Sequence, residues 1–502
     1  MTSMIGPLAR AVQVAPERVA VRCGANELTY AQTWERCRRL AGALRGLGLA
    51  EGDRVAVVGA NCHRYLELYQ AIPGAGLAIV PLNPRHAPAE LGYALEDSGA
   101  RVLFAGAGID APLDGLERVI DLGEGYEELL AEASPADFPD LEPDTLAGLF
   151  YTGGTTGAAK GVMLTHRNLL ANALHFQVCW RFRPETCWLI VAPLFHAAGS
   201  IAVLAIVWNV GEQVVLRAFD PGAALDLIER FGVTATLVVP TMLAALTEEQ
   251  FVRPRDISTL CRLSHGGAPI ATETLRRARA AFPDTTFLHI YGATETSPIA
   301  TLLPDEELLL DAPQARSCGR PAVGVEVTIR DQLGERVPTG EVGELAIRGD
   351  NVMVGYWNKP KETAAALADG WYRSGDVGYQ DEHGYIYLVD RAKDMIVTGG
   401  ENVYCSEVEE ALFSHPAVDE AAVFGIPDER WGEAVHAVVV PREAVSEDDL
   451  REHCRRLIAG YKVPKAIELR SEPLPKSAAG KVLKRELRAP YWAGHETAVA
   501  GA

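Results

Sequence analysis

Paired cysteines at the spacing of a metal site or a redox motif are missing from this 502-residue chain. Its nine cysteines are scattered, and no two of them form a C-x-x-C pair. Zinc sites and disulfide frameworks depend on regular cysteine spacing, so we expect neither. Free, mostly buried thiols in a reducing cytoplasm are the simplest interpretation.

An excess of positive charge is missing as well. The 47 basic residues stand against 67 acidic ones, which gives a net charge of −20. Such a surface repels the phosphates of nucleic acid and the anionic face of a membrane, so we expect no nucleic-acid partner. A polyanionic substrate such as ATP would therefore need a local site of backbone amides, lysines and metal.

The sequence shows neither a leader nor a convincing membrane span. Met1–Arg10 lacks a basic region followed by a long apolar run, which argues against a secretory signal. Leu189–Val210 is apolar enough to suggest a span, but Pro193, His196 and Asn209 interrupt it. We expect a buried strand, a loop and a core helix there. The interpretation is a cytoplasmic protein without a transmembrane segment, with a homodimer as one option for its assembly.

Repeats and low-complexity linkers are also missing, and 502 residues exceed one compact core. Over the first 140 residues, short β-branched runs such as Arg54–Val58 alternate with helical stretches such as Tyr30–Leu47, which predicts βαβ units and a largely parallel sheet. From Val325, short alternating strands predict a smaller barrel-like unit. The last stretch, from about Met395, alternates again and predicts a compact α+β domain.

The segment Tyr151–Gly161 carries the strongest local signal for chemistry. Four glycines in eleven residues allow tight turns and bring backbone N–H groups close to a ligand. Thr152, Thr155 and Thr156 add hydroxyl donors and Lys160 adds a positive charge, a set that suits a polyphosphate. The order Ala-Lys-Gly differs from the Gly-Lys-Ser/Thr of a Walker A loop, which argues against a P-loop NTPase or kinase.

This loop and the motifs after it resemble those of the adenylate-forming (ANL) superfamily, which includes the acyl- and aryl-CoA synthetases. The resemblance extends from Leu28 to Lys481 and rests on segments in the family's order: Tyr151–Gly161, Pro193–His196, Gly266–Pro269, Tyr291–Glu295, Tyr372–Asp376, Asp390–Ile396, Gly399–Val403 and Pro475–Arg485. The chain departs from the family pattern at three positions. Gly153 replaces the usual serine, and Ala159 and Cys405 replace usual prolines.

The resemblance implies a nucleotide site and an adenylation centre. Glu295 would hold Mg²⁺, Thr294 would contact the α-phosphate, Lys160 would contact phosphate, and Lys481 would be the adenylation lysine. The ATP- and AMP-binding residues would be Thr152, Gly153, Gly154, Thr155, Thr156, Gly157, Gly266, Gly267, Ala268, Tyr291, Gly292, Asp376 and Arg391. Of these, Tyr291 would stack on adenine and Asp376 would accept the ribose hydroxyls.

The resemblance also implies sites for the acid and for coenzyme A. His196, Ala197 and Gly199 would border the acyl group, and Gly399, Gly400 and Glu401 would line the pantetheine channel. Lys393 would be the pivot of a hinge. The expected α/β organisation is a large N-terminal domain over residues 1–390 with mixed βαβ-type sheets and a small barrel-like unit, a hinge over 391–394, and a small mobile α+β C-terminal domain over 395–502.

The activity implied is that of an AMP-forming acyl-CoA synthetase with Mg²⁺, ATP and coenzyme A. Small residues near the acyl site, with no Arg or Lys among them, favour a roomy apolar pocket and a medium-chain, cyclic or aromatic monocarboxylate. Two alternatives stay open at this point. One is an enzyme that stops at the acyl-adenylate and hands it to another protein. The other is a non-catalytic nucleotide sensor on the same fold.

Overall fold

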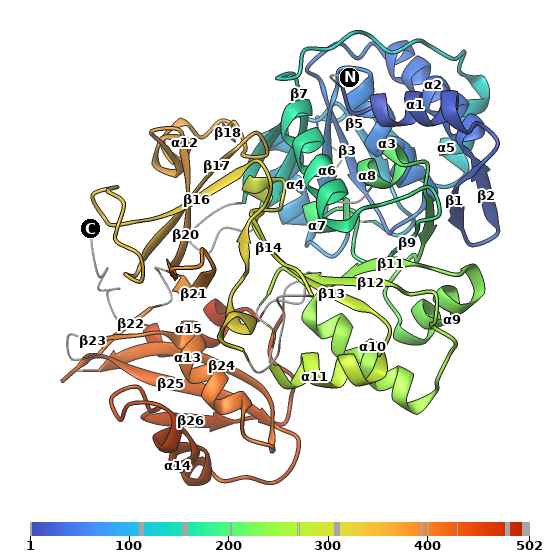
Figure 1. Ribbon diagram of the computed structural model, residues 1–502. Coiled ribbons are helices and arrows are strands. Elements are labelled where there is room, and N and C mark those ends of the chain that lie inside the picture. The colour runs from blue at the N-terminus through green and yellow to red at the C-terminus, as the bar shows by residue number, and fades with distance from the viewer. Residues whose placement is uncertain are drawn as a thin grey trace. The chain divides into compact units, whose positions relative to one another are not determined.

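The computed structural model describes residues 3–109, 115–152, 159–200, 203–268, 270, 272–305, 312–391, 395–398, 401–428, 430–476 and 482–493 (Figure 1). Contacts within the chain divide it into two compact units. The first consists of Met1–Gly267, Arg277–Val327 and Ile347–Arg373, and the second of Ala268–Arg276, Thr328–Ala346 and Ser374–Ala502. The functional boundary at 391–394 stays a prediction.

A nine-stranded sheet forms one layer of the first unit. Its order is β15 (Arg320–Pro321), β14 (Thr301–Leu303), β13 (Thr286–Tyr291), β12 (Arg262–Gly266), β11 (Ala235–Val238), β9 (Cys187–Ile190), β10 (Glu212–Val215), β1 (Val19–Cys23) and β2 (Asn26–Thr29). The run from β13 to β1 is parallel throughout. Parallel strands end at the same edge of a sheet, so the loops that follow β9, β12 and β13 share one edge.

A seven-stranded sheet forms a second layer of this unit. Its order is β18 (Gly355–Tyr356), β8 (Lys160–Thr165), β7 (Leu146–Thr152), β4 (Ala78–Leu82), β3 (Arg54–Val58), β5 (Val102–Ala105) and β6 (Arg118–Asp121). β7 and β8 form an antiparallel hairpin, and β18 pairs antiparallel with β8. The glycine-rich segment is therefore the connection of a hairpin at one side of an otherwise parallel sheet.

The helices of the first unit cover these sheets and fill the space between them. They are α1 (Gly6–Val14), α2 (Tyr30–Gly46), α3 (His63–Gly74), α4 (Pro88–Ser98), α5 (Glu124–Glu132), α6 (His166–Trp180), α7 (Ala197–Ser200), α8 (Val203–Trp208), α9 (Pro221–Phe231), α10 (Pro240–Val252) and α12 (Pro360–Ala366). The helix α11 (Thr272–Ala281) crosses the division between the units, and η1 (Thr294–Thr296) and η2 (Pro313–Arg316) are short 3-10 turns. α3 contacts β4 and β7 of one sheet and β1 of the other, which explains why nearly all of its residues are buried.

Local sequence signals fix the start of two helices. Thr29 caps α2, where its hydroxyl accepts from the backbone N–H of Gln32 at 3.2 Å and the Gln32 side chain accepts in return. Thr165 caps α6 through the same reciprocal pair with Asn168. Such capping boxes satisfy N–H groups that the first helical turn leaves open.

The barrel-like region is a curled five-stranded sheet. Its order is β16 (Val325–Arg330), β17 (Gly343–Gly349), β20 (Trp371–Gln380) and β19 (Leu367–Ala368), and β21 (Ile386–Arg391) also pairs with β20. A further sheet in the second unit has the order β23 (Glu401–Val403), β22 (Ile396–Thr398), β25 (Gly432–Pro441) and β24 (Val418–Asp428), with β26 (Ala466–Leu469) beside β25. The helices α13 (Cys405–Phe413), α14 (Glu447–Leu457) and α15 (Lys484–Trp492) pack on this last sheet.

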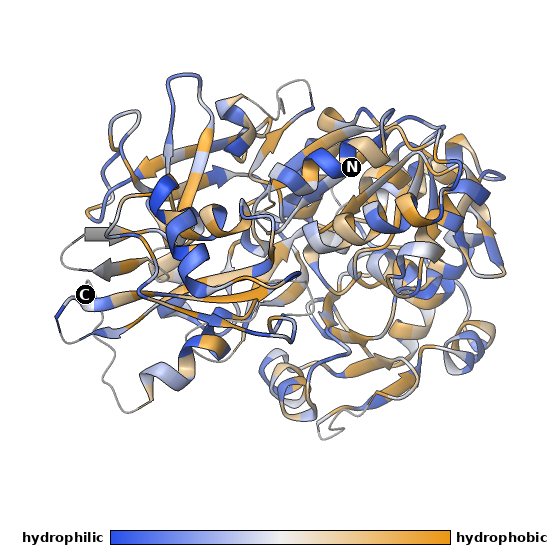
Figure 2. Ribbon diagram, turned by 90° about the horizontal axis from the view of Figure 1, so that it is seen from below, coloured by the Kyte–Doolittle hydropathy of each residue, from blue (hydrophilic) through white to orange (hydrophobic). Residues whose placement is uncertain are grey.

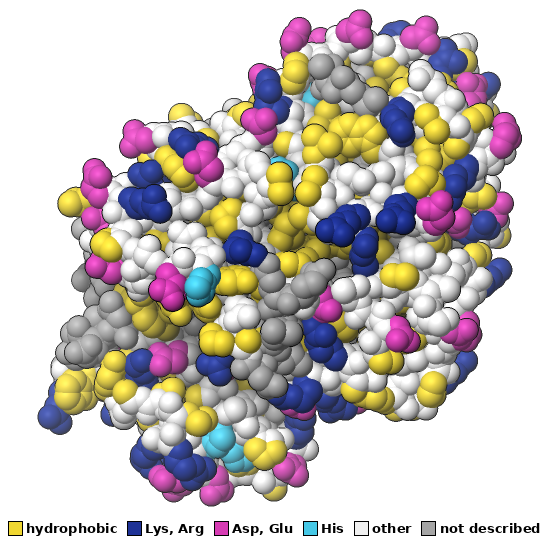
Figure 3. Space-filling model, in the orientation of Figure 1, with side chains coloured by type: hydrophobic (Ala, Val, Ile, Leu, Met, Phe, Trp, Pro, Cys, Tyr) yellow, Lys and Arg dark blue, Asp and Glu magenta, His cyan; other side chains and the backbone are white. Residues whose placement is uncertain are grey.

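The distribution of hydropathy agrees with this arrangement. In Figure 2 the central strands are largely orange, whereas outer helices carry blue turns. On the face shown in Figure 3, acidic and basic side chains are interspersed with apolar ones. The predicted α/β class, with a large mixed N-terminal part and a small C-terminal α+β part, is confirmed.

The apolar stretch Leu189–Val210 is divided among β9, α7 and α8, as its interruptions predict. Among the helices that the structure describes, none is long and apolar enough to cross a membrane.

Candidate active site

The hairpin β7–β8 holds both ends of the glycine-rich connection. Thr152 and Lys160 are Cα partners across the hairpin, so the two described flanks of the loop face each other. The hydroxyl of Tyr93, on α4, donates to the carbonyl of Ala159 at 3.0 Å. Tyr151 donates to the Asp97 carboxylate, also on α4, at 2.7 Å. α4 therefore anchors the loop at its base.

Five predicted phosphate-binding residues lie outside the described residues, namely Gly153, Gly154, Thr155, Thr156 and Gly157. Their proposed roles remain predictions. The two predicted residues at the ends of the loop are described, and each of them is half-buried on the hairpin.

A buried tyrosine links two of the predicted residues. The ammonium of Lys160 lies 4.7 Å from the ring centroid of Tyr356, a cation–π contact. The hydroxyl of Tyr356 donates to Oε1 of Glu295 at 2.9 Å. Burial, followed by the nearby Glu295 carboxylate, raises the pKa of Tyr356 far above its ordinary value, so the phenol stays a donor. Sequence reasoning missed Tyr356.

The turn that carries Thr294 and Glu295 follows directly after β13. Gly292 is essential to it, because a Cβ at this position would lie 1.8 Å from the carbonyl oxygen of Pro298. Thr296 closes the turn, since its hydroxyl accepts from the Ala293 N–H at 3.0 Å. Tyr291, the predicted adenine-stacking residue, ends β13 immediately before the turn.

A second segment, which contains Asn351 and Met353, holds this turn in place through hydrogen bonds. The amide of Asn351, which is fully buried, donates to the carbonyls of Thr296 at 2.7 Å and Ile299 at 2.6 Å. The backbone N–H of Met353 donates to the Glu295 carbonyl at 2.8 Å. The turn is thereby fixed by residues more than fifty positions downstream, and no local pattern in the sequence reports this.

Gly266 and Gly267 lie beside the turn. Gly266 ends β12 and is the Cα partner of Ile290 in β13. A Cβ on Gly266 would approach the Ile290 carbonyl oxygen to 2.2 Å, so a larger residue would push the strands apart. Gly266 and Gly267 lie at the carboxyl end of β12, and Tyr291 lies at the carboxyl end of the neighbouring strand β13. These predicted nucleotide-site residues are therefore close together at one edge of the sheet. Ala268 follows in the second unit.

The predicted acyl-site residues follow β9 at the same edge. Ala197 and Gly199 form the short helix α7, and His196 precedes it with its ring 4.6 Å from the ring of Phe195. The buried Asn61 pins this segment, since its side chain accepts from the Leu194 N–H at 2.8 Å and donates to the Ala192 carbonyl at 3.0 Å. Asn61 is another residue that sequence reasoning missed.

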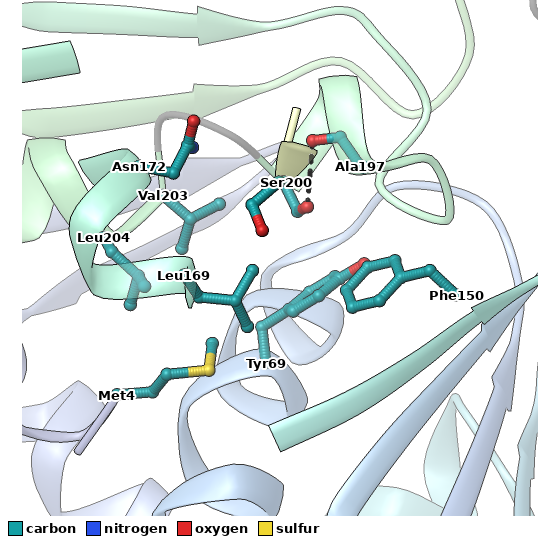
Figure 4. A pocket seen from close by; sticks show the side chains of 10 residues that line it. Met4, Tyr69, Phe150, Leu169, Asn172, Ala197, Ser200, Val203 and Leu204 are labelled. Carbon is teal, nitrogen blue, oxygen red and sulfur yellow. Dashed lines mark hydrogen bonds between the residues drawn. The ribbon is translucent and has the colours of Figure 1, made fainter. Parts of the chain in front are cut away.

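A small cavity lies next to Ala197 (Figure 4). Its lining is mostly apolar and carries no charged side chain; the residues are Met4, Tyr69, Phe150, Leu169, Asn172, Ala197, Ser200, Val203, Leu204 and Ser297. Its volume of about 20 Å³ is the space of a single water molecule. The roomy acyl pocket expected from the small residues stays a prediction, because part of the chain beside Ala197 lies outside the described residues.

In the second unit, Asp376 and Arg391 are Cα partners on the antiparallel strands β20 and β21. The backbone N–H of Asp376 donates to the Ser374 hydroxyl at 3.1 Å, and that hydroxyl donates to the Leu345 carbonyl at 2.9 Å. The structure thus brings the two predicted nucleotide residues of this unit to one position of a ladder, although it does not describe the Arg391 side chain.

The remaining predictions concern the second unit. Glu401 begins β23 and pairs with Thr398, but its side chain is outside the description. Lys393, Gly399, Gly400 and Lys481 lie outside the described residues altogether. Their roles stay predictions.

The donor set at the turn fits a magnesium ion that is held mainly by phosphate and water. Groups of three or more His, Cys, Asp or Glu able to hold a metal are absent from the described residues. A single half-buried carboxylate, that of Glu295, is what such an ion needs, because Mg²⁺ keeps several waters and takes one or two carboxylates beside the substrate phosphates.

Comparison with known proteins identifies the class. The model of the AMP-binding enzyme family matches residues 8–357, and that of the AMP-binding enzyme C-terminal domain matches residues 407–481. The chain belongs to the AMP-binding enzyme family.

The chain is similar to known proteins over nearly its whole length and nearly the whole length of each of them. A feruloyl-CoA synthase of Amycolatopsis sp is 41% identical over 95% of this chain and 97% of its own. A fatty acid–[acyl-carrier-protein] ligase, ScoC, of Streptomyces coeruleorubidus is 38% identical over 96% and 95%. The solved o-succinylbenzoate coenzyme A synthetase of Bacillus subtilis, in complex with ATP and magnesium ion, is 32% identical with a TM-score of 0.86, covering 97% of this chain and 98% of that one.

The predicted enzyme class, an AMP-forming acid–thiol ligase, is confirmed. Mg²⁺, ATP and coenzyme A are confirmed as cofactor and co-substrates at the level of the family.

Proposed function

We propose that this enzyme activates an apolar medium-chain, cyclic or aromatic monocarboxylate as the acyl-adenylate and transfers the acyl group to coenzyme A. The observation that carries the proposal is the shared sheet edge, at which the loops after β9, β12 and β13 leave together. An uncharged, mostly apolar cavity beside Ala197 and a carboxylate held at Glu295 adjoin loops from this edge. The feruloyl-CoA synthase relative, named for an aromatic acid, supports this substrate class.

In the first half-reaction, a carboxylate oxygen of the acid attacks the α-phosphorus of ATP, and pyrophosphate leaves. A carboxylate is a poor acyl donor because its leaving group would be oxide, whereas AMP leaves readily. The enzyme's contribution is positioning and charge neutralisation. Lys160 contacts phosphate, Thr294 contacts the α-phosphate, and Lys481 lies at the attacking carboxylate. Glu295 holds the magnesium ion, which neutralises phosphate charge when bound.

In the second half-reaction, the thiol of coenzyme A loses its proton and its sulfur attacks the acyl carbon. The bond from the acyl carbon to the phosphate-linked oxygen breaks, and AMP leaves with that oxygen. Gly399, Gly400 and Glu401 line the thiol's approach, and Asp376 with Arg391 holds the ribose. Lys393 is the pivot about which the C-terminal domain, residues 395–502, turns between the two half-reactions.

The substrate class can be tested by measuring the rate of pyrophosphate release with a panel of different acids. We expect cinnamate-type, benzoate-type or medium-chain acids to give the highest rates, and malonate to give little, because the cavity lining offers no cation for a second carboxylate. A clear preference for malonate over every apolar acid would refute the proposed substrate class.

A second candidate differs in the acceptor. The relative named as an acyl-carrier-protein ligase favours a carrier-protein thiol in place of coenzyme A. Incubation with acid, ATP and either coenzyme A or a phosphopantetheinylated carrier protein, followed by mass analysis, distinguishes the two. Acyl-CoA as product supports our proposal, and transfer to the carrier protein alone supports the second candidate.

A further inference from the structure

Tyr356 contacts two side chains of opposite charge, Lys160 and Glu295, to which we assign different roles in binding the metal–ATP complex. Its ring face carries the Lys160 ammonium at 4.7 Å, and its hydroxyl donates to Glu295 at 2.9 Å. The tyrosine is 7% exposed, so water competes little for either contact. One side chain therefore joins the cation at the end of the phosphate loop to the carboxylate proposed for the metal.

The backbone on either side of Tyr356 is tied to both partners. Tyr356 pairs with Val162 in β8, and the N–H of Trp357 donates to the Gly161 carbonyl at 2.8 Å. Three residues earlier, Met353 donates to the backbone carbonyl of Glu295 at 2.8 Å. The ring is thus placed by main-chain hydrogen bonds before any ligand arrives, which is the condition for a preorganised site.

The hydrogen bond has a direct consequence for the carboxylate. It occupies Oε1 of Glu295 and selects one orientation of the group, while Oε2 accepts no hydrogen bond from the residues that the structure describes. Hydrogen bonds of this kind orient carboxylates that ligate metals and tune their affinity. The cation–π contact likewise holds the Lys160 ammonium in place while no phosphate neutralises it.

We propose that Tyr356 is a positioning residue for adenylation, which orients Glu295 toward the divalent cation of the metal–ATP complex and holds Lys160 at the phosphate loop. This inference rests on the proposed function of Glu295 and Lys160. A purely structural tyrosine would affect folding stability but not the affinity for the cation.

The two contacts can be separated by substitution. Tyr356→Phe keeps the ring under Lys160 and removes the hydroxyl, whereas Tyr356→Leu removes both contacts. The probe is Mn²⁺, titrated by electron paramagnetic resonance with ATP present and no acid. Because loss of a group that orients a metal-ligating carboxylate typically lowers metal affinity about 10- to 100-fold, we expect Tyr356→Phe to weaken Mn²⁺ binding by that factor. Metal-free ATP binding should stay within about twofold of wild type in Tyr356→Phe and weaken in Tyr356→Leu.

Tyr491→Phe is the matched control, since Tyr491 also donates to a carboxylate, that of Glu468, at 2.7 Å. It should leave Mn²⁺ affinity unchanged. A Glu295→Gln background provides the second control. If Tyr356 acts through Glu295, adding Tyr356→Phe to Glu295→Gln should not weaken Mn²⁺ binding further.

Equal Mn²⁺ affinity of Tyr356→Phe and wild type would overturn the inference, as would full additivity with Glu295→Gln. The titration requires no turnover, so it is distinct from the test of the proposed function. A wild-type protein that binds Mn²⁺ and ATP with the predicted Tyr356 dependence, but adenylates no acid of the panel, would refute the function and leave the positioning role standing.

Discussion

Single residues in this molecule act mainly by fixing the groups that face the substrate. Asn61 pins the loop before α7, Tyr356 orients Glu295, and Gly292 lets the turn after β13 close. Asn61 and Tyr356 each make a hydrogen bond to a group of the site, and Gly292 leaves room for a carbonyl oxygen that a side chain would displace. Their replacement should therefore alter geometry before it alters chemistry.

A buried histidine predicts how folding stability depends on pH. Burial lowers the pKa of His166 to about 4, and its Nδ1 accepts from the Met4 N–H at 3.0 Å, which requires a neutral ring. In the unfolded chain this histidine titrates near its ordinary value of about 6.5, so the unfolded state binds more protons between these values. Its contribution to stability is complete above pH 6.5 and declines as pH falls toward 4, by at most about 3 kcal/mol.

Urea unfolding at several pH values measures this contribution. His166→Gln should show a shallower loss of unfolding free energy between pH 6.5 and 4 than wild type. His383→Gln, at a side chain that is 73% exposed, is the control and should follow wild type. An unchanged slope in His166→Gln would contradict this assignment.

At the scale of elements, the site depends on pairings between distant segments. The stretch from Asn351 to Tyr356 makes two hydrogen bonds to carbonyls of η1 and a third to the Ile299 carbonyl just after it, and then pairs with β8. α4 holds the base of the β7–β8 connection through Tyr93 and Asp97. These supports converge on the two elements that carry Lys160 and Glu295.

Asn351→Ala tests the support beneath η1. The Asn351 amide donates to the carbonyls of Thr296 and Ile299, which are both buried. An unsatisfied buried acceptor costs about 1–3 kcal/mol. We expect a loss of about 2–4 kcal/mol in unfolding free energy and impaired adenylation. Asn26→Ala, at the exposed first residue of β2, should change stability by no more than about 0.5 kcal/mol. A stability loss no larger than that of the control would show that the two hydrogen bonds of Asn351 contribute little to folding stability.

Much of this architecture was predictable, and the reasons differ between elements. The β-branched run Arg54–Val58 predicted a strand of a largely parallel sheet, and the order of motifs predicted which loop ends share a site. Tyr356 was not predictable, because its hydrogen bond joins residues 61 positions apart through the two-residue strand β18. The small cavity beside Ala197 was not predictable for a similar reason, since its lining includes side chains as distant in sequence as Met4.

At the scale of the whole molecule, two half-reactions share one chain. In the proposed cycle, Lys481 serves adenylation and leaves the site before the thiol enters. Conformational steps of this kind gate many enzymes. Replacement of Lys481 should then affect one half-reaction and spare the other.

Lys481→Ala should lower acid-dependent pyrophosphate exchange by at least about 100-fold, as loss of a charge-stabilising group does in other active sites. Thioester formation from a supplied acyl-adenylate and coenzyme A should continue at a rate close to wild type. Arg485→Ala, in the same basic run, is the control and should retain both activities. Surviving pyrophosphate exchange in Lys481→Ala would remove this lysine from the mechanism.

The central claim is that the carboxylate attacks the α-phosphorus of ATP, and oxygen labelling tests it most directly. The acid that the panel selects is prepared with ¹⁸O in its carboxylate and incubated with the wild-type enzyme, ATP, Mg²⁺ and coenzyme A. With both carboxylate oxygens labelled, mass analysis should then find one ¹⁸O atom in AMP and one in the carbonyl of acyl-CoA, beside unlabelled pyrophosphate. Formation of ADP, with the label in inorganic phosphate, would contradict the account.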